Sequence, residues 1–185
     1  MTHGVTLSRL WPTLATLYML DDGTVGMRSW TEGDTETLLP NLVFARQNGV
    51  PLIENGVPGD RVTSWGGGNW SGSGDADLRT LRGGACMRTI EGTQFLIYAY
   101  FSTATPSGMA RTFQAYGCEY AMLLDMNSQE HTYMALYVQD EDTLDTQHLV
   151  RAMEEIDERG SDGARIPRFV STADNRDFFY LLRRE

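Results

Sequence analysis

The residues best placed to do chemistry are a carboxylate and a carboxamide that follow an apolar run. The run covers residues 120–124, and Asp125 and Asn127 come directly after it. In α/β proteins, ligands often bind where polar side chains follow the end of a buried strand. Asp125 could act as an acid, as a base or as an anchor for a sugar, and Asn127 could hold a hydroxyl group. Because alternate residues of a strand share a face, we expect both side chains on one side.

The competing interpretation of Asp125 and Asn127 is a strand-end turn, since both residue types favour turns. Residues 125–130 loosely resemble a calcium-binding loop but lack its central glycine and its distal glutamate. Calcium is therefore only a weak alternative, and we expect no cofactor and no metal. The histidines have no metal-ligand spacing, and we expect surface positions for His3, His131 and His148, although His131 could act as a general base.

A glycosidase that works with two carboxylates would need a second acid near Asp125. Glu54, Glu130 and Asp177 are candidates that the sequence does not rank. No nucleophilic-serine, dinucleotide-binding or phosphate-loop motif is present.

All 15 basic residues are arginine. The lack of lysine excludes Schiff-base chemistry and a phosphate-loop lysine, although it also fits a biased genomic composition. Arg82 could bind a phosphate through its planar guanidinium group. The alternative for Arg82 is a salt bridge with one of the nearby acids.

The length and the charge of the chain limit the classes of protein to which it can belong. With 185 residues, 41% of them hydrophobic, the chain is long enough for one domain with a sizeable core. Its formal charge of −10 disfavours nucleic-acid binding. No apolar run approaches the roughly 20 residues that a membrane-spanning helix needs, and residues 1–7 do not form a signal peptide. It remains open whether the chain is the C-terminal part of a longer protein.

The two cysteines, Cys86 and Cys118, form no Cys-x-x-Cys motif, which excludes a zinc ribbon or a thioredoxin-type site. Both lie beside small or apolar residues, so buried free thiols are expected. A disulfide between them remains the alternative, because the sequence does not reveal their distance.

The elements that must position these residues follow from turns and apolar patterns. Thr105, Pro106 and Gly117 mark the start and the end of a helix. The strand carrying Asp125 follows that helix, and the continuous apolar run at 95–101 predicts a central strand buried on both faces.

The other expected elements are weaker. The segment 64–74 contains five glycines and two tryptophans, and is either a mobile lid or a flexible surface loop. We expect a hairpin around Asp21-Asp22-Gly23, a loop at 31–37, a short helix or extended segment at 38–47, strands at 50–54, 82–88 and 131–138, a helix at 147–158, and short strands at 169–170 and 178–182.

Several of these pieces, in this order, resemble the phosphodiester glycosidase family, which includes the enzyme that uncovers mannose 6-phosphate tags and bacterial proteins linked to exopolysaccharide. The likeness rests on segments 46–56, 81–84 and 92–97, on the helix that ends at Gly117, and on residues 121–127. It covers the chain from about Ala15 onward. The ending at 176–180, Arg-Asp-Phe-Phe-Tyr, resembles that of divergent members.

The resemblance implies roles for individual residues. Arg82 matches the family's arginine and would hold the phosphate, and Asp125 matches its loop aspartate and would act at the anomeric centre or orient the sugar. Substrate-binding positions would be Gln47, Asn48, Asn127 and Ser128. The resemblance also implies an exported protein, either periplasmic or extracellular, that acts on a carbohydrate or a sugar phosphate.

This chain lacks the three glycines that follow the aspartate in the family, since Met126, Asn127 and Ser128 stand there. Glycine lets backbone amides approach a phosphate or a sugar closely. Two functions are therefore predicted for one α+β domain over residues 1–185, with a mixed, largely antiparallel sheet and two main helices. The first is a hydrolase of a sugar phosphodiester or a related surface glycan. The alternative is a degenerate, non-catalytic module for glycan binding or exopolysaccharide assembly.

Overall fold

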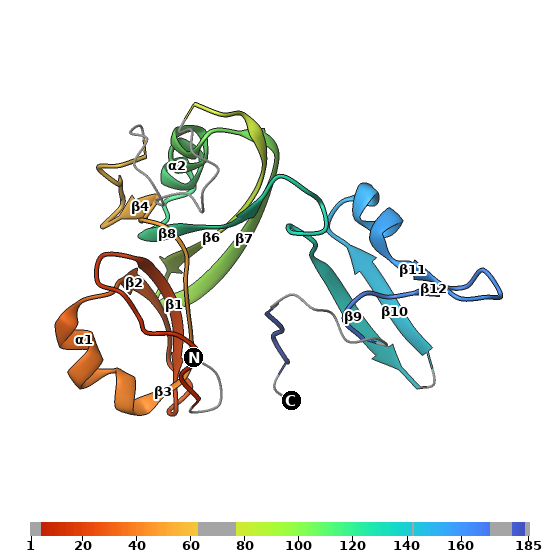
Figure 1. The fold of residues 1–185 in the computed structure, drawn as a ribbon, viewed down its shortest axis with the longest axis horizontal. Helices are drawn as coiled ribbons and strands as arrows, with labels where there is room; N and C mark the ends of the chain where they lie inside the picture. The colour runs from red at the N-terminus through yellow and green to blue at the C-terminus, as the bar shows by residue number, and fades with distance from the viewer. Residues whose placement is uncertain (1–4, 63–76, 142, 171–178, 184–185) are drawn as a thin grey trace. The chain divides into compact units, whose positions relative to one another are not determined.

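The computed structural model describes residues 5–62, 77–141, 143–170 and 179–183 (Figure 1). The glycine-rich and tryptophan-rich segment predicted as a lid or a loop, 64–74, lies outside the described residues.

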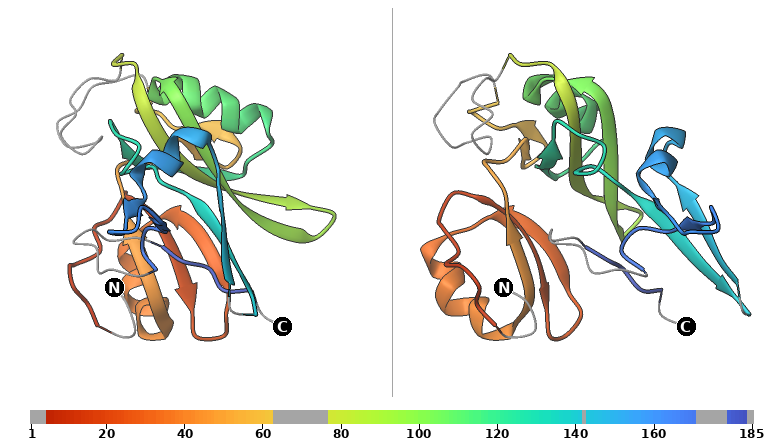
Figure 2. Two further views of the ribbon diagram at one scale, coloured as in Figure 1. Left: turned by 90° about the vertical axis from the view of Figure 1, so that its right-hand side faces the viewer. Right: turned by 45° about the vertical axis from the view of Figure 1, so that its right-hand side comes forward.

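The fold belongs to the α+β class, as predicted, because it combines helices with several sheets (Figures 1 and 2). All strand pairs among the described residues are antiparallel, so the largely antiparallel character is confirmed. The chain divides into two compact units, Met1–Thr132 and Tyr133–Glu185. The assignment of residues 1–185 to one phosphodiester-glycosidase-like domain stays a prediction.

A three-stranded sheet opens the first unit. The hairpin predicted around residues 21–23 is confirmed: β1 (Ala15–Leu20) and β2 (Val25–Ser29) pair, and β3 (Leu42–Gln47) joins β1 on its other side. Gly23 takes a φ of 85°, which a glycine adopts at little cost in such a turn. The strand order is β2-β1-β3, so β2 lies at an edge of this sheet.

The loop expected at 31–37 is instead the short helix α1 (Glu32–Thr37). Its start is fixed by a capping box in which Thr31 and Asp34 bond each other's backbone N–H groups. Asp34 stands where this motif usually has a glutamate. The segment was predicted as a loop because most of its residues are polar. The 3-10 helix η1 (Leu39–Asn41) follows, and the buried ring of Trp30 lies in the core of this region.

A five-stranded sheet forms the rest of the first unit, in the order β5-β4-β8-β6-β7. As predicted, the apolar run before Asp125 is a buried strand, and it lies inside the sheet between β4 and β6. The run predicted as the central strand is instead part of β7, which among the described residues pairs only with β6 and lies at the edge of the sheet. The strands are β4 (Ile53–Glu54), β5 (Val57–Pro58), β6 (Thr80–Ile90), β7 (Thr93–Ala104) and β8 (Tyr120–Met126).

The predicted helix before β8 is confirmed as α2 (Pro106–Ala115). The hydroxyl of Thr105 accepts the N–H of Gly108 at 3.1 Å, and Gly117 ends the helix with a φ of 72°. The helix packs on one face of the five-stranded sheet through Met109, Phe113 and neighbouring apolar residues. The other face of that sheet shares a second core with the three-stranded sheet.

Gly84 of β6 allows α2 to pack closely on the sheet. A Cβ atom at Gly84 would lie 2.8 Å from the Met109 side chain and 3.1 Å from the Met122 carbonyl oxygen. We therefore expect Gly84→Ala to lower the free energy of unfolding by about 1–3 kcal/mol, measured by urea denaturation. Gly33→Ala is the matched control, because its added Cβ would meet nothing closer than 3.8 Å. Equal unfolding midpoints for the two variants would contradict the close packing.

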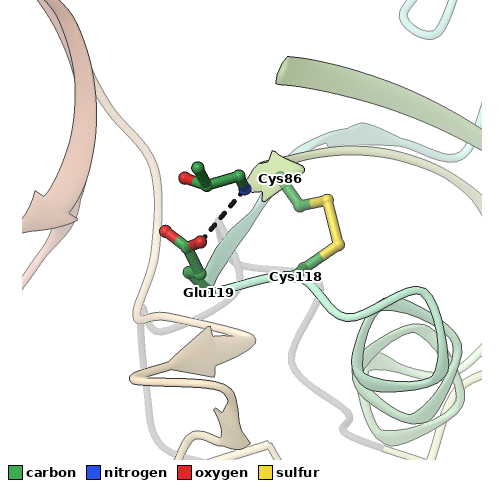
Figure 3. Close-up of a disulfide and its surroundings, with 4 residues drawn as sticks. Cys86, Cys118 and Glu119 are labelled. Atoms are coloured by element: carbon green, nitrogen blue, oxygen red, sulfur yellow. Dashed lines mark hydrogen bonds between the residues drawn. A yellow bond between two sulfur atoms is a disulfide. The ribbon is translucent and has the colours of Figure 1, made fainter. Parts of the chain in front are cut away.

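Cys86 of β6 and Cys118, which precedes β8, form a disulfide with Cα atoms 5.9 Å apart (Figure 3). Their exposed fractions are 0% and 1%, so the expectation of buried side chains is correct but that of free thiols is wrong. The turn at Gly117 returns the chain beside β6 and brings the two cysteines together. Beside the disulfide, the carboxylate of Glu119 accepts the backbone N–H of Thr89 at 3.0 Å and links the same two segments.

The second unit is built on a hairpin. β9 (Ala135–Asp140) and β10 (Thr143–His148) pair antiparallel, and the 3-10 helix η2 (Arg151–Ile156) follows. A two-residue pair, β11 (Glu158–Arg159) and β12 (Arg165–Ile166), completes the described strands of this unit.

The helix predicted for residues 147–158 is wrong. Its first two residues end β10, and only residues 151–156 turn, as a 3-10 helix without a side-chain cap. The acidic residues at the end of this segment oppose the dipole of a longer helix. One of its apolar residues still points into the core, since Met153 is fully buried. Residues 169–170 lie in a turn, and residues 179–183 form neither helix nor strand, in contrast to the strands predicted there.

A polar network in the second unit corrects the expectation that His148 lies at the surface. Nε2 of His148 lies 3.0 Å from the carboxylate of Asp157, and their side chains are 6% and 2% exposed. The hydroxyl of Tyr133 donates to Asp157 at 2.9 Å and lies 3.0 Å from His148. Burial raises the pKa of Tyr133, and bonds to Tyr137 and Asp157 raise it further, so the phenol stays neutral. Because its groups are buried and bonded to one another, we assign this network a role in stabilising the second unit.

None of the helices in the described part of the chain is long and apolar enough to cross a membrane.

Candidate functional site

An irregularity in β8 decides where Asp125 lies. Gly84 of β6 pairs with Leu123, whereas Arg82, two residues earlier, pairs with Met126, three residues later. The extra residue on β8 is a β-bulge, which changes the face to which the following side chains belong. Leu123 and Met126 both belong to the core beneath α2. Asp125 instead interacts electrostatically with Arg46 of β3 and Tyr98 of β7.

The carboxylate of Asp125 is accessible and has basic neighbours. Its side chain is 48% exposed, and its Oδ1 accepts the backbone N–H of Met126 at 2.7 Å. Nδ1 of His131 lies 3.7 Å from the same oxygen. Arg46 of β3 is half-buried: burial lowers the pKa of its guanidinium, and the charge of Asp125 opposes that shift. We call Asp125, His131, Arg46 and Tyr98 the Asp125 cluster.

The tautomer of His131 follows from its hydrogen bond. Nδ1 lies 3.0 Å from the carbonyl oxygen of Met126, which can only accept, so Nδ1 carries the proton. In the neutral ring Nε2 is then the basic nitrogen. The side chain is 27% exposed, and the backbone N–H of His131 donates to Ser128 Oγ at 3.3 Å. Whereas the sequence favoured a surface histidine, the structure places a possible base beside Asp125.

Tyr98 of β7 forms the buried side of the Asp125 cluster. Its hydroxyl donates to the carbonyl oxygen of Thr132 at 2.8 Å. Burial raises the pKa of the phenol, and the charges of Tyr100 and Asp125 raise it further. Tyr98 is therefore a neutral donor and not a base. Gly83 makes room for this hydroxyl, since a Cβ there would lie 2.8 Å from it.

Arg82, predicted to hold a phosphate, is not brought to Asp125. It is fully buried and pairs with Phe101, whose ring packs edge-on against Phe113 of α2. Its guanidinium donates to the carbonyl oxygens of Ala104 at 2.9 Å and Leu78 at 3.1 Å. In this structure Arg82 links the start of β6 to the end of β7 on the face that α2 covers.

Gln47 and Asn48 act within the protein. The amide of Gln47 donates to the carbonyl oxygen of Trp11 and to the hydroxyl of Thr16, both at 2.9 Å, and its oxygen accepts the Trp11 N–H. The amide of Asn48 donates to the carbonyl oxygens of Leu123 and Leu124 at the bulge. Asn48 therefore anchors β8 just before Asp125. We assign it a role in positioning that strand and not in binding the substrate directly.

Asn127 does not share a face with Asp125 in the way that the alternation rule predicts. β8 ends at Met126, and Asn127 takes a left-handed conformation with a φ of 73°. Its side-chain oxygen accepts the Thr80 hydroxyl at 3.0 Å, and its N–H donates to the Leu81 carbonyl at 2.8 Å. Both bonds direct Asn127 toward the start of β6.

The backbone after Asp125 forms no ready cradle for an anion. The N–H of Met126 bonds the Asp125 side chain, and that of Asn127 bonds Leu81. The Ser128 hydroxyl accepts the N–H of His131. These bonds use two of the backbone N–H groups that a glycine-rich loop would direct at a ligand. Within the described residues, no group of three or more His, Cys, Asp or Glu side chains could hold a metal ion.

The three candidates for a second carboxylate separate in the structure. Glu130 is exposed in the turn that carries His131, whereas Glu54 lies on β4, close to Tyr120 at the opposite end of β8. Asp177 lies outside the described residues. Sequence reasoning missed Arg46 and Tyr98, and no motif marks either. Tyr98 belongs to β7 of the same sheet as Asp125, whereas Arg46 belongs to β3 of the other sheet.

No protein-family model and no curated protein matches the sequence. The resemblance to the phosphodiester glycosidase family therefore stays a prediction.

Proposed function

We propose that this protein is a hydrolase acting on a sugar phosphodiester or a related surface glycan, with Asp125 at the reaction centre. The observation that supports this best is the meeting of three groups at the end of β8. They are the half-exposed carboxylate of Asp125, the imidazole of His131 at 3.7 Å and the charge of Arg46. A carboxylate, a base and a guanidinium suit the hydrolysis of a bond between a sugar and a phosphate.

Each group has a defined role in this proposal. Arg46 binds the phosphate, the role predicted from the sequence for Arg82. Water attacks the anomeric carbon, its proton passes to Nε2 of His131, and the bond from that carbon to the phosphate oxygen breaks. The products are a free sugar and a phosphate monoester. Asp125 stabilises the positive charge that develops on the sugar ring, while Asn48 holds the strand in position.

One observation favours the second candidate, a non-catalytic module for glycan binding or exopolysaccharide assembly. The N–H groups of Met126 and Asn127 are bonded within the protein, and the Ser128 hydroxyl accepts the N–H of His131, so these groups are not directed at an anion. Such a module would use the Asp125 cluster to bind a glycan without converting it. The two candidates differ in turnover, not in the surface that they use.

The experiment measures sugar release from a panel of alkyl phosphodiesters of hexose 1-phosphates. We expect Asp125→Asn and His131→Asn each to lower kcat/KM by about 10²–10⁴-fold, the range typical of a lost acid–base group. Arg46→Met should mainly raise KM for phosphodiesters. Asp140→Asn is the control, since Asp140 is an exposed carboxylate in the second unit.

The result that would overturn the hydrolase is saturable glycan binding without sugar release, with an affinity that Asp125→Asn leaves unchanged. Binding without release that Asp125→Asn does weaken would support the non-catalytic module at the same surface.

We also propose that the protein is exported, either periplasmic or extracellular. The buried disulfide between Cys86 and Cys118 supports this, because disulfides persist mainly in oxidising compartments.

A further inference from the structure

A second candidate site lies in the first unit, away from Asp125. It is a cleft of about 910 Å³ that runs along β2. One wall consists of the consecutive residues 24–29, and the facing wall includes the β4–β5 turn and residues 117–120. Along β8, Tyr120 at the cleft lies five residues from Asp125, roughly 17 Å at about 3.3 Å per residue. Neither predicted function uses this cleft.

The wall formed by β2 is an open strand edge. β2 is the outer strand of its sheet, and among the described residues no other strand pairs with this edge. The bonds from Leu20 N–H to Thr24 O and from Trp30 N–H to Leu14 O show that even-numbered residues bond toward β1. In an antiparallel pair the alternate residues face the other way. Val25, Met27 and Ser29 therefore present their N–H and C=O groups to the cleft.

The facing wall is acidic. Glu54 and Glu119 line it, and one oxygen of Glu119 accepts the N–H of Thr89. The guanidinium of Arg28 also lines the cleft, but it lies 3.2 Å from the buried carboxylate of Asp34, which offsets its charge. The cleft thus combines main-chain bonding groups with two carboxylates. An extended segment that carries a basic side chain complements both features.

The chain itself contains such a segment. Residues 179–183, Phe-Tyr-Leu-Leu-Arg, form neither helix nor strand in the structure, although their aromatic residues favour strands. Tyr180, Leu181 and Leu182 are 67%, 79% and 81% exposed. The segment has as many residues as β2, and Arg183 supplies a positive charge that complements the carboxylates of Glu54 and Glu119.

We propose that residues 179–183 of a second copy of this chain add as a strand to β2, with Arg183 beside Glu54 and Glu119. The addition satisfies the open main-chain groups of Val25, Met27 and Ser29 and covers two leucines. Reciprocal exchange between two copies closes a two-fold dimer. This inference goes beyond the proposed hydrolase, since it concerns assembly and a different surface.

A charge exchange in the full chain tests the proposal. Sedimentation velocity over a range of concentrations should show a monomer–dimer equilibrium for the wild type. Glu54→Arg and Arg183→Glu should each weaken the dimer by about tenfold or more, because each places like charges together. The double variant should recover most of the lost affinity. Glu36→Arg on the exposed face of α1 is the control and should have no effect.

A wild-type protein that stays monomeric at all concentrations would overturn the proposal. A dimer that neither single exchange weakens would overturn it too, since its interface would lie elsewhere. A labelled synthetic peptide of residues 178–185 gives a second readout. It should bind the Arg183→Glu variant, whose own segment is impaired, and bind the Glu54→Arg variant at least about tenfold more weakly. Equal binding to both would argue against this cleft.

Discussion

Arg82→Ala is expected to lower the free energy of unfolding by about 3–5 kcal/mol, as for other large-to-small changes in a core. Arg82 is fully buried, and its guanidinium donates to the carbonyl oxygens of Ala104 and Leu78. Alanine would leave a cavity where the start of β6 lies beside the end of β7, and it would leave the two carbonyl oxygens without their donor. Chemical denaturation followed by circular dichroism measures the loss.

Two further variants separate a structural role of Arg82 from a catalytic one. Arg82→Met fills most of the volume without burying a charge, so it should cost only about 1–2 kcal/mol. It should also keep sugar release or glycan binding close to the wild-type level. The exposed Arg111 of α2 is the control, and Arg111→Ala should change stability by less than about 0.5 kcal/mol. If Arg82→Met folds normally but abolishes activity, Arg82 takes part in the reaction and the phosphate-binding role proposed for Arg46 is wrong.

Removing the disulfide is expected to have the second large effect. The bond between Cys86 and Cys118 closes a loop with a sequence separation of 32. Loss of a cross-link over such a loop costs about 3–4 kcal/mol at 25 °C in the chain-entropy model. The double variant Cys86→Ala/Cys118→Ala should therefore melt about 8–14 °C lower than the oxidised wild type, measured by thermal circular dichroism.

Reductant provides the internal control for the disulfide. It should lower the melting temperature of the wild type toward that of the double alanine variant and leave the variant unchanged. The wild type is first treated with reductant under denaturing conditions, so that the buried bond is accessible, and is then refolded. A melting temperature that this treatment leaves unchanged would show that the two thiols are not bonded.

The local signals in the sequence identified the elements near the candidate site well. Thr105, Pro106 and Gly117 set the ends of α2, and the apolar run before Asp125 became the inner strand β8. These features depend on the backbone preferences of a few adjacent residues and on the burial of apolar side chains. Both can be inferred from a short stretch of sequence without knowledge of the tertiary structure. The same reasoning failed at 147–158, where the hairpin partner of β10 overrode an apolar spacing typical of a helix.

The partners of the candidate residues could not be predicted in this way. Arg82 and Asp125 lie on opposite faces of the sheet because β8 has one extra residue opposite β6. A bulge of this kind changes the face of every later side chain, and nothing in the sequence marks it. Arg46 and Tyr98 reach Asp125 from segments far away in the chain.

The sequence alone determined the α+β class, the hairpin at residues 15–30, the helix α2, the strand that ends at Asp125 and the buried positions of the two cysteines. Each of these follows from short-range patterns of turns, caps and apolar residues. Only the tertiary structure decided that the cysteines are bonded, that Arg82 belongs to the core, and that His131 and Arg46 accompany Asp125. Those results depend on strand order, on one bulge and on the packing of two sheets. All three bring together segments that are remote in the chain, and local sequence patterns do not specify which segments meet.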